Sequence, residues 1–404
     1  MKRKSDLFLN IITYCSSFIG VLLLSSIFLF ILSKGASLVN MDLLTKNYWS
    51  KNYLVAPVIT ESNSEYIKPE TLSEETYFSS KWGVGFVDTV SNDKQKVILL
   101  EYLDENSPLN QLIDTSAGDN QGQSFQIEIG TQIEKIDYVN IKGVVDFAGA
   151  LASDTASSLV ERLEEADSIS TLFLKTPGGG IRGSLISTFI LIVVSLAIAL
   201  PLGLAAAIYL NEYARKTKFN SLLRSAIETL TGVPSIVYGL MGVTVLYPIS
   251  SAVGATTTSI FLGSLTMAII LLPTIIRSSE EALLVVSDSL RDASNSLGAT
   301  QTQTIFKVVL PSAVPGILTG VLLSIGRVIG ESAALIYTMG TFINDSPALL
   351  SQGTSLAVHI WSIMSGEQPN FELASAISLI ILAFVLIMNI SVKLISKRFM
   401  KGLN

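Results

Sequence analysis

Residues 229–276 read TLTGVPSIVYGLMGVTVLYPISSAVGATTTSIFLGSLTMAIILLPTII and contain no Asp, Glu, Lys or Arg. A helix that crosses the roughly 30 Å hydrocarbon core of a membrane needs about 20 apolar residues. These 48 residues are therefore enough for two spans, which we expect to be joined by the turn-like segment 250–259. The whole chain of 404 residues has a mean hydropathy of +0.53 and only 15% charged residues, whereas soluble domains carry about 25%. The sequence predicts an integral membrane protein.

Four further apolar runs bring the predicted transmembrane helices to six, and they cover Leu7–Leu32, Gly183–Asn211, Pro315–Met339 and Leu373–Val392. The first run exceeds the length of a signal-peptide core and lacks a small-x-small cleavage site, so we expect residues 1–35 to form an uncleaved anchor helix. Pro201 interrupts the second run and predicts a kink, because proline removes a backbone donor. The run that ends at Met339 carries two charged residues, Arg327 and Glu331.

Charge divides the chain into two parts. Residues 36–180 hold 22 acidic and 10 basic residues, a net charge of −12, while the rest holds 11 acidic and 17 basic residues, a net charge of +6. Short cytoplasmic loops are enriched in Lys and Arg. Fourteen of the 17 basic residues fall in segments that are cytoplasmic if the N-terminus is inside: Lys2, Arg3, Lys4, Arg215, Lys216, Lys218, Arg224, Arg277, Arg291, Lys307, Lys393, Lys397, Arg398 and Lys401. Both termini are therefore predicted to be cytoplasmic, and residues 36–180 to be extracellular.

The acidic block 36–180 has the pattern of a folded α+β domain inserted between the anchor helix and a core of five spans, residues 181–404. Apolar residues alternate at Phe125, Ile127 and Ile129 and cluster in 97–100, as half-buried strands require. A later stripe of apolar residues has helical spacing: Ala152, Ala156, Leu159, Leu163 and Ala166. A surface of this charge repels anions, so we expect a spacer or docking surface rather than an anion-capture site.

Several chemistries are excluded by composition. The chain has one cysteine, Cys15, and one histidine, His359, so we expect no internal disulfide, no metal site and no Ser/His catalytic pair; His359 is expected to be an ordinary surface or packing residue. No G-x-x-x-x-G-K-[ST] motif occurs, and the glycines at 178–180 lack the following lysine. The chain is therefore not expected to hydrolyse ATP, to hold a cofactor or to bind nucleic acid. The triple glycine predicts a flexible entry or a close backbone approach.

The cytoplasmic loop 278–314 predicts two helices joined by a turn. Apolar residues recur at 3-4-3-4 spacing and predict one helix face: Leu283, Val286, Leu290, Ala293 and Leu297. Asp288, Arg291 and Asp292 are then expected to turn away from that face. Gly298 supplies the left-handed backbone that ends a helix, and Thr300 with Gln303 has the spacing of a capping box. The second helix is expected to stop before Pro311. The alternative is an ordinary surface hairpin with no role.

The segment from Asp292 to Pro311, D-A-S-N-S-L-G, nine residues, then V-V-L-P, resembles the EAA motif of ABC-importer permeases, E-A-A-x3-G-x9-I-x-L-P. In that family this loop presents a short helix to the ATPase subunit. The resemblance places Asp292 at the glutamate, Ala293 and Ser294 at the alanines, and Gly298 at the glycine. The departures are Asp for Glu, Ser for Ala and Val for Ile.

The flanking sequences resemble the PstA subfamily of phosphate-specific permeases. They are TPGGGIRGSL (176–185), PLGLAAAIYLNEYA (201–214), IETLTGVPSIVYGL (227–240), LLPTIIRSSEEAL (271–283) and GRVIGESAAL (326–335). The resemblance covers the chain from Thr176 onward and the first span, but not most of the acidic block. It implies an all-α polytopic membrane domain of six transmembrane helices with the permease fold, here with an extracellular insertion.

The resemblance also implies a function: half of the translocation pathway of an ATP-driven phosphate importer in a bacterial plasma membrane, surrounded by membrane lipid. The implied partners are a dimeric ATPase, a second homologous permease and an extracellular phosphate-binding protein. The implied ATPase-coupling residues are Glu280, Glu281, Asp292, Ala293, Leu297, Gly298, Ala299, Leu310 and Pro311. The candidate substrate-path residues are Arg327, Glu331 and Arg277, which are chosen for their charge in or at the end of a predicted span.

Charged residues inside a predicted span are themselves an indication of function. A charge near the membrane centre costs several kcal/mol, about 2.5–3.5 on insertion scales, so Arg327 and Glu331 are candidates for function. Four residues apart on one helix face, they can neutralise each other, or phosphate can compete for the guanidinium fork. Arg277, at the inner end of its span, can instead snorkel to the interface. The glycines at 232 and at 239–242 fit either a bent pathway or tight helix packing.

Two other functions are compatible with parts of this pattern. One is a permease for another oxyanion, such as sulfate or molybdate. The other is a membrane sensor, since an external domain between the first two spans is a common sensor layout. A sensor needs a signalling output, yet the longest cytoplasmic segment predicted is the loop 278–314, which favours the transporter.

Overall fold

The computed structural model describes the backbone of residues 2–401 except 63, 71, 91–95, 117–120, 150–152, 177, 216 and 367–368, and the side chains of 10–396 outside these gaps. The chain forms two compact units. The first comprises Met1–Thr45 and Ile181–Asn404, and the second comprises Lys46–Gly180. The predicted basic residues Lys2, Arg3, Lys4, Lys216, Lys397, Arg398 and Lys401 and the predicted helix residue Ala152 lie outside the described side chains.

The first unit is helical. Its described helices are α1 (Lys2–Gly35), α2 (Met41–Thr45), α4 (Arg182–Ile208), α5 (Lys218–Thr231), α6 (Ser235–Met241), α7 (Tyr247–Ala252), α8 (Ile260–Leu284), α9 (Asp288–Ser296), α10 (Gln301–Thr304), α11 (Leu310–Gly330), α12 (Ala333–Thr338), α13 (Leu356–Met364) and α14 (Phe371–Lys401). A 3-10 turn η1 (Ala36–Leu38) follows α1, and three π-helical turns lie between helices: η3 (Tyr209–Tyr213), η4 (Gly242–Leu246) and η5 (Ile305–Val309).

Six helical stretches of the described chain are long and apolar enough to cross a membrane. They are Asn10–Leu38, Arg182–Tyr213, Ser235–Ala252, Ile260–Leu284, Gln301–Gly330 and Phe371–Ser396. Each predicted span has a counterpart among them, so the prediction of a six-span membrane protein is confirmed. The charge-free stretch 229–276 contains the whole of Ser235–Ala252 and most of Ile260–Leu284, which continues past it to include Arg277, Glu280 and Glu281. Helix α4 continues across Pro201.

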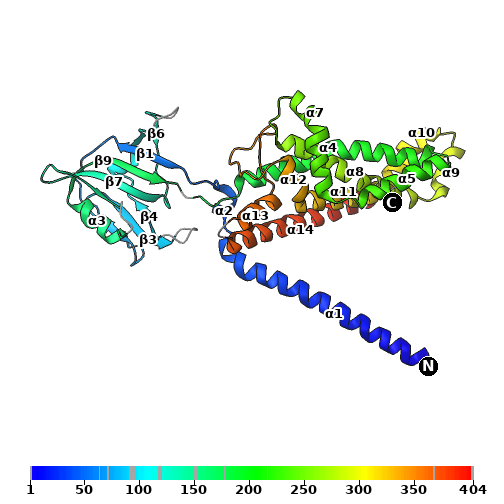
Figure 1. Ribbon diagram of the computed structural model, residues 1–404, viewed down its shortest axis with the longest axis horizontal. Coiled ribbons are helices and arrows are strands. Elements are labelled where there is room, and N and C mark those ends of the chain that lie inside the picture. Colours follow the sequence, from blue (N-terminus) through cyan, green and yellow to red (C-terminus); the bar gives the residue numbers. More distant parts are fainter. Residues whose placement is uncertain are drawn as a thin grey trace. The chain divides into compact units, whose positions relative to one another are not determined.

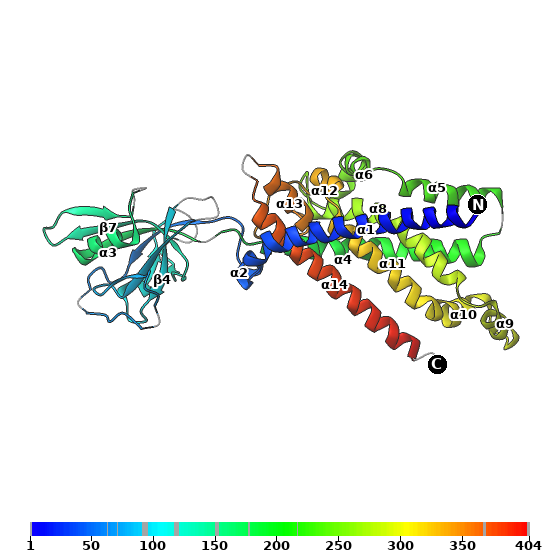
Figure 2. The same cartoon turned by 90° about the horizontal axis from the view of Figure 1, so that it is seen from below.

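The core of the first unit lies where α4, α8 and α11 pack together (Figures 1 and 2). Leu191 of α4, Leu271 of α8 and Val328 of α11 are fully buried there. A second buried cluster, which includes Leu283 and Val309, lies where α8 meets the segment that leads into α11. Helix α8 therefore packs along its length, as a central helix of a bundle does.

One predicted span is divided. Helix α11 ends at Gly330, Glu331 has an extended backbone (φ −78°, ψ 128°), and α12 begins at Ala333. The prediction of a continuous helix over Pro315–Met339 is therefore wrong. Arg327 lies in the last turn of α11, whereas Glu331 lies beyond its end.

The second unit contains nine described strands in one antiparallel sheet. They are β1 (Asn52–Pro57), β2 (Tyr77–Ser79), β3 (Val84–Val90), β4 (Lys96–Leu103), β5 (Leu112–Asp114), β6 (Ser124–Phe125), β7 (Gln132–Asn140), β8 (Val145–Ala148) and β9 (Ala166–Lys175). Their order is β2-β3-β4-β7-β9-β1-β5-β6, with β8 also paired to β7. A 3-10 turn η2 (Pro108–Asn110) precedes β5, and one helix, α3 (Ala156–Glu164), lies between β8 and β9 in sequence.

The core of the second unit lies between the sheet and α3. Leu159 and Leu163 of α3 are fully buried with Phe86 and Leu172 of the sheet. Trp82, also fully buried, donates its indole N–H to the carbonyl of Leu163 at 2.9 Å. The stripe predicted for this helix is confirmed at positions 156, 159 and 163, whereas Ala166 already belongs to β9.

The strand predictions are confirmed in part. Residues 97–100 lie in β4, as predicted. The alternating segment 125–129 is not a strand beyond Phe125, and Ile129 is 63% exposed. The chain has to turn there to enter β7, and Gly130 provides the positive φ of 88° that this turn uses.

The triple glycine at 178–180 makes a close backbone approach within the second unit. Gly179 N donates to Tyr48 O at 2.8 Å and Gly180 N to Asn47 O at 3.0 Å. A Cβ at Gly180 would collide with the carbonyl of Lys46. This geometry is that of a close backbone approach, which is one of the two roles expected for these glycines.

Candidate functional site

The loop between α8 and α11 forms the predicted pair of helices around Gly298. Ser287 caps α9 by accepting from Ser289 N, and Gly298 has φ +83°. Thr300 and Gln303 form a capping box at the start of α10, with each side chain bonded to the other residue's backbone N–H. These local predictions are confirmed. We call residues 288–304 the hairpin.

The prediction that the apolar stripe from Leu283 to Leu297 lies on a single helix is wrong. Helix α8 ends at Leu284 and α9 begins at Asp288. The apolar stripe therefore divides: Leu283 and Val286 are buried, whereas Leu290 is 45% and Leu297 is 89% exposed. Ser287 explains the break, because a serine that caps a new helix ends the previous one. The consequence is that the apolar side chains of the hairpin are left uncovered.

The entry into α11 also differs from the prediction. Helix α10 does not stop before Pro311 but continues through η5 into α11. Leu310 and Pro311 lie in the first turn of α11, directly after the π-helical turn η5. The hairpin is thus joined to a membrane span without an intervening loop.

Five of the coupling residues implied by the resemblance lie on the hairpin, whereas Glu280 and Glu281 lie on α8. Asp292, Ala293, Leu297 and Gly298 are exposed, and Ala299 is half-buried. Arg291, which the stripe predicts to turn away with Asp288 and Asp292, does not: its side chain is 18% exposed and lies 2.9 Å from the carboxylate of Glu212. Neither Arg291 nor Glu212 is among the predicted site residues.

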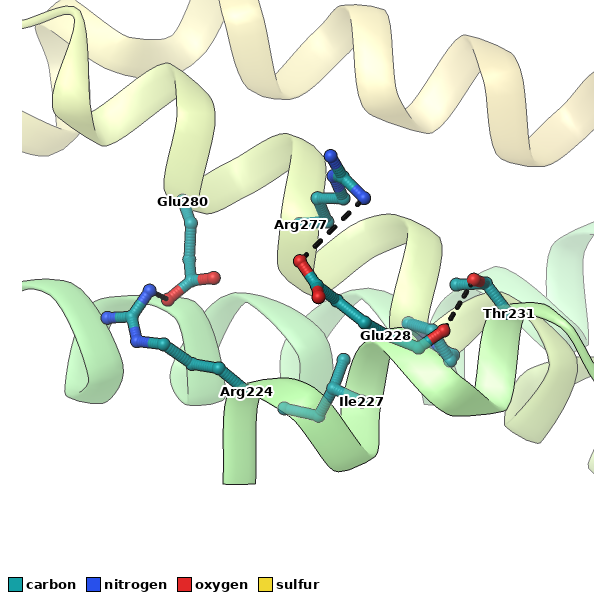
Figure 3. Close-up of a pocket in the computed structure, with 7 residues that line it drawn as sticks. Arg224, Ile227, Glu228, Thr231, Arg277 and Glu280 are labelled. Atoms are coloured by element: carbon teal, nitrogen blue, oxygen red, sulfur yellow. Dashed lines mark hydrogen bonds and ion pairs between the residues drawn. The ribbon is translucent and has the colours of Figure 1, made fainter. Parts of the chain in front are cut away.

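A pocket lies between α5 and α8 (Figure 3). Its lining residues are Arg224, Ile227, Glu228 and Thr231 of α5, and Pro273, Arg277 and Glu280 of α8. Two pairs of opposite charge cross it. Arg224 Nη1 lies 2.8 Å from Glu280 Oε1, and Arg277 Nη1 lies 4.0 Å from Glu228 Oε1. The structure therefore brings the predicted residues Arg277 and Glu280 into one pocket.

The two pairs differ in exposure. The Glu280 side chain is 13% exposed, whereas those of Arg277 and Glu228 are 61% and 65% exposed. Arg277 also pairs with Glu281 at 3.2 Å, four residues along the same helix. Arg224 and Glu228 are not among the predicted site residues, although their spacing of four positions next to a charge-free stretch is a usable signal.

Arg327 and Glu331 do not share a helix face. The Glu331 carboxylate accepts from Ala334 N at 3.2 Å and so caps the start of α12. The predicted arginine–glutamate pair four residues apart on one helix is therefore wrong, because the helix ends between the two residues. Both side chains are half-buried.

Known proteins share the part of the chain that contains the hairpin. Residues 199–401 match the model of the family described as Binding-protein-dependent transport system inner membrane component. The chain is 33% identical over 241 residues to the Probable ABC transporter permease protein YqgI of Bacillus subtilis (strain 168), which covers 56% of this chain and 81% of that protein. It is 36% identical over 225 residues to the Phosphate transport system permease protein PstA of Pasteurella multocida (strain Pm70), with 54% and 79% covered.

One solved structure, the MetNI methionine ABC transporter in an inward facing conformation, aligns with a TM-score of 0.43 at 20% identity, over 55% of this chain and 94% of that one. The family match extends over half of the chain and includes four of its six candidate spans and the hairpin. The chain therefore belongs to the binding-protein-dependent transport system inner membrane components, the permease subunits of ABC importers, and is similar to the PstA permeases among them.

Proposed function

We propose that this chain is the permease subunit of an ATP-driven phosphate importer and that the tip of its hairpin, around Gly298, docks on a separate ATPase subunit. The observation that carries the proposal is the hairpin itself. Its tip is a sharp turn at Gly298, its Leu290 and Leu297 side chains are exposed, and it continues into the span that carries Arg327. An uncovered apolar tip on a well-capped element is suited to bind another protein.

Phosphate as the cargo is supported by the relatives. The Pasteurella multocida protein is named a phosphate transport system permease, while the Bacillus subtilis protein is named without a cargo. The guanidinium groups of Arg277 and Arg327 would offer the passing anion the planar donor fork that phosphate oxygens match. Sulfate and molybdate share part of this chemistry, so uptake competition has to separate them.

The proposal includes an orientation and an assembly. Both termini would be cytoplasmic, with the hairpin on the same side and the acidic segment 36–180 outside the cell. One set of six spans would form half of the pathway, so a second homologous permease would complete it. A dimeric ATPase would lie on the inner side and a phosphate-binding protein on the outer side.

The test is phosphate uptake by cells that carry Gly298→Val, with Gly298→Asn as the matched control. Within the described chain no atom lies close enough to obstruct a new Cβ at Gly298, so the two substitutions differ mainly in backbone preference. Asn tolerates a positive φ far better than a β-branched residue does.

We expect Gly298→Val to lower uptake about tenfold or more, since strain of about 1–3 kcal/mol at the tip would displace it. We expect Gly298→Asn to retain most activity, with equal amounts of both variants in the membrane. Normal uptake by Gly298→Val contradicts the coupling role. Competition by excess sulfate or molybdate as strong as that by phosphate contradicts the cargo.

A further inference from the structure

The π-helical turn η3 is the place where the hairpin is fastened to α4. Glu212 lies in this turn, and its side chain is only 9% exposed. Glu212 Oε1 accepts from Asn211 Nδ2 at 2.8 Å and from Arg291 Nη2 at 2.9 Å. A carboxylate this enclosed depends on such partners, because burying an unpaired charge is costly. Its cation is contributed by α9, 79 positions along the chain.

Arg291 joins three elements with one guanidinium. Besides Glu212, Nη2 donates to Leu283 O at 2.9 Å and Nη1 donates to Val286 O at 2.6 Å. Leu283 lies in the last turn of α8 and Val286 just beyond its end, where main-chain acceptors lack the N–H donors of a following helical turn. The planar fork supplies donors in two directions at once, which a lysine ammonium on its flexible stem does not reproduce.

The second helix of the hairpin is fastened to the same turn. Gln301 Nε2 donates to the main-chain carbonyl of Glu212 at 2.8 Å, and the Tyr213 hydroxyl lies 3.3 Å from Thr302 Oγ1. Both legs of the hairpin are therefore tied to η3. The tip between them, with Leu297 89% exposed, has no such tie to η3 among the described contacts.

We infer that Glu212 and Arg291 are a positioning pair that transmits movement of the hairpin to α4 and α8. This inference rests on the proposed function of the hairpin as the ATPase-docking element. A force applied at the tip reaches α4 through the Glu212 carboxylate and α8 through the carbonyls of Leu283 and Val286. An enclosed, multiply bonded pair transmits such a force, because releasing either partner leaves a buried charge unpaired.

Asp288 provides a matched control. It pairs with the same Arg291 at 3.2 Å, but its side chain is 93% exposed. An exposed pair of this kind holds its partner weakly. Removing the charge of Asp288 therefore tests the loss of an acidic partner of Arg291 without loss of the enclosed link.

The experiment uses the assembled transporter in lipid vesicles. Inorganic phosphate uptake and ATP hydrolysis are measured per assembled transporter, with and without the phosphate-binding protein, for Glu212→Gln, Arg291→Lys and Asp288→Asn. We expect both enclosed-pair variants to lose about tenfold or more of uptake. Their ATP hydrolysis should persist but no longer rise when the binding protein is added. Asp288→Asn should stay within about twofold of the wild type.

The outcomes separate this inference from the proposed function. Docking is followed independently by Leu297→Cys in a Cys15→Ser background, labelled with a photoactivatable thiol reagent and tested for cross-linking to the ATPase. If the cross-link forms while Glu212→Gln behaves like Asp288→Asn, the positioning role is overturned and the proposed function stands. The positioning role is likewise overturned if Glu212→Gln lowers uptake but leaves stimulation by the binding protein intact. If no cross-link forms and Gly298→Val transports normally, the proposed function itself fails.

Discussion

Arg224 of α5 and Glu280 of α8 form an ion pair, with Nη1 2.8 Å from Oε1. The two side chains are unequally exposed, at 42% for Arg224 and 13% for Glu280. Arg224 Nη2 also donates to Leu210 O at 2.6 Å, in the π-helical turn η3 that follows α4. Because none of the residues described in α5 is buried, these polar contacts help to fasten the helix to η3 and α8.

The unequal exposure predicts unequal effects of the two neutralising substitutions. Arg224→Gln leaves a largely enclosed carboxylate without its cation, whereas Glu280→Gln leaves an arginine that reaches water. We expect Arg224→Gln to cost about 1–3 kcal/mol of stability and Glu280→Gln less. Thermal unfolding of the detergent-purified protein measures both. The double variant should recover part of the loss, and equal losses in the two single variants would count against this account.

The parts of the fold set by local sequence were predictable. A charge-free run of 48 residues has few ways to fold except as membrane spans, because its backbone groups must be bonded within helices. The Gly298 turn and the Thr300 capping box are equally local, since each depends on residues no more than a few positions apart. For the same reason the helical stripe at 156–163 was recognisable.

The parts set by contacts between distant residues were not predictable. Arg291 is expected to face away if the stripe lies on one continuous helix, whereas the break at Ser287 turns it toward Glu212. The local sequence around Arg291 or Glu212 does not indicate that the two residues, 79 positions apart, form a pair. Likewise, the end of α11 at Gly330 could not be predicted, because the sequence stays apolar up to Met339. Hydropathy indicates how long an apolar segment is, but not whether its helix is continuous.

Gly239 is expected to tolerate no side chain, because it packs against another backbone. A Cβ there would lie 2.9 Å from both Cα and O of Ala334, at the contact between α6 and α12. Gly326 in α11 is the control, since the described structure leaves open space around its Cβ position. We expect Gly239→Ala to cost about 1–3 kcal/mol and Gly326→Ala to be neutral or to gain up to about 1 kcal/mol from helix propensity.

Thermal unfolding of the purified variants measures the difference. A Gly239→Ala protein as stable as Gly326→Ala would mean that α6 and α12 separate easily. That result would favour the bent pathway over tight packing as the reason for the glycines at 239–242. A Cβ at Gly242 would collide with the side chains of Thr266 and Thr338, which favours packing.

The burial of His359 leads us to expect that the protein loses stability in mild acid. The side chain is fully buried, and Nδ1 lies 2.8 Å from Ser184 Oγ, which in turn lies 2.9 Å from Thr354 Oγ1. Burial disfavours the imidazolium and lowers the pKa of His359 from 6.5 to about 4. Between these values the unfolded chain binds a proton that the folded chain does not. Stability is therefore fully present above pH 6.5 and falls as the pH is lowered toward 4.

The loss expected from this residue is about 3 kcal/mol at pH 4 and about 2 kcal/mol at pH 5. The unfolding temperature of the purified wild type should consequently fall more between pH 7 and pH 5 than that of His359→Asn, which cannot titrate. Ser184→Ala keeps the histidine and should retain the wild-type pH dependence. An identical pH dependence in wild type and His359→Asn would show that the histidine is not held neutral.

Replacing Arg327 or Glu331 by glutamine is expected to affect phosphate uptake differently, because the two side chains have different roles. Glu331 caps α12 through Ala334 N at 3.2 Å, and a glutamine oxygen can accept the same hydrogen bond. Glu331→Gln should therefore retain most phosphate uptake, while Glu331→Ala should lose more. Arg327→Gln removes a half-buried guanidinium from the last turn of α11, and we expect uptake to fall about tenfold or more if that group meets the anion. Uptake is normalised to the amount of each variant in the membrane. If Arg327→Gln and Glu331→Gln lose uptake equally, the two residues act as one unit and the capping role assigned to Glu331 does not explain its presence.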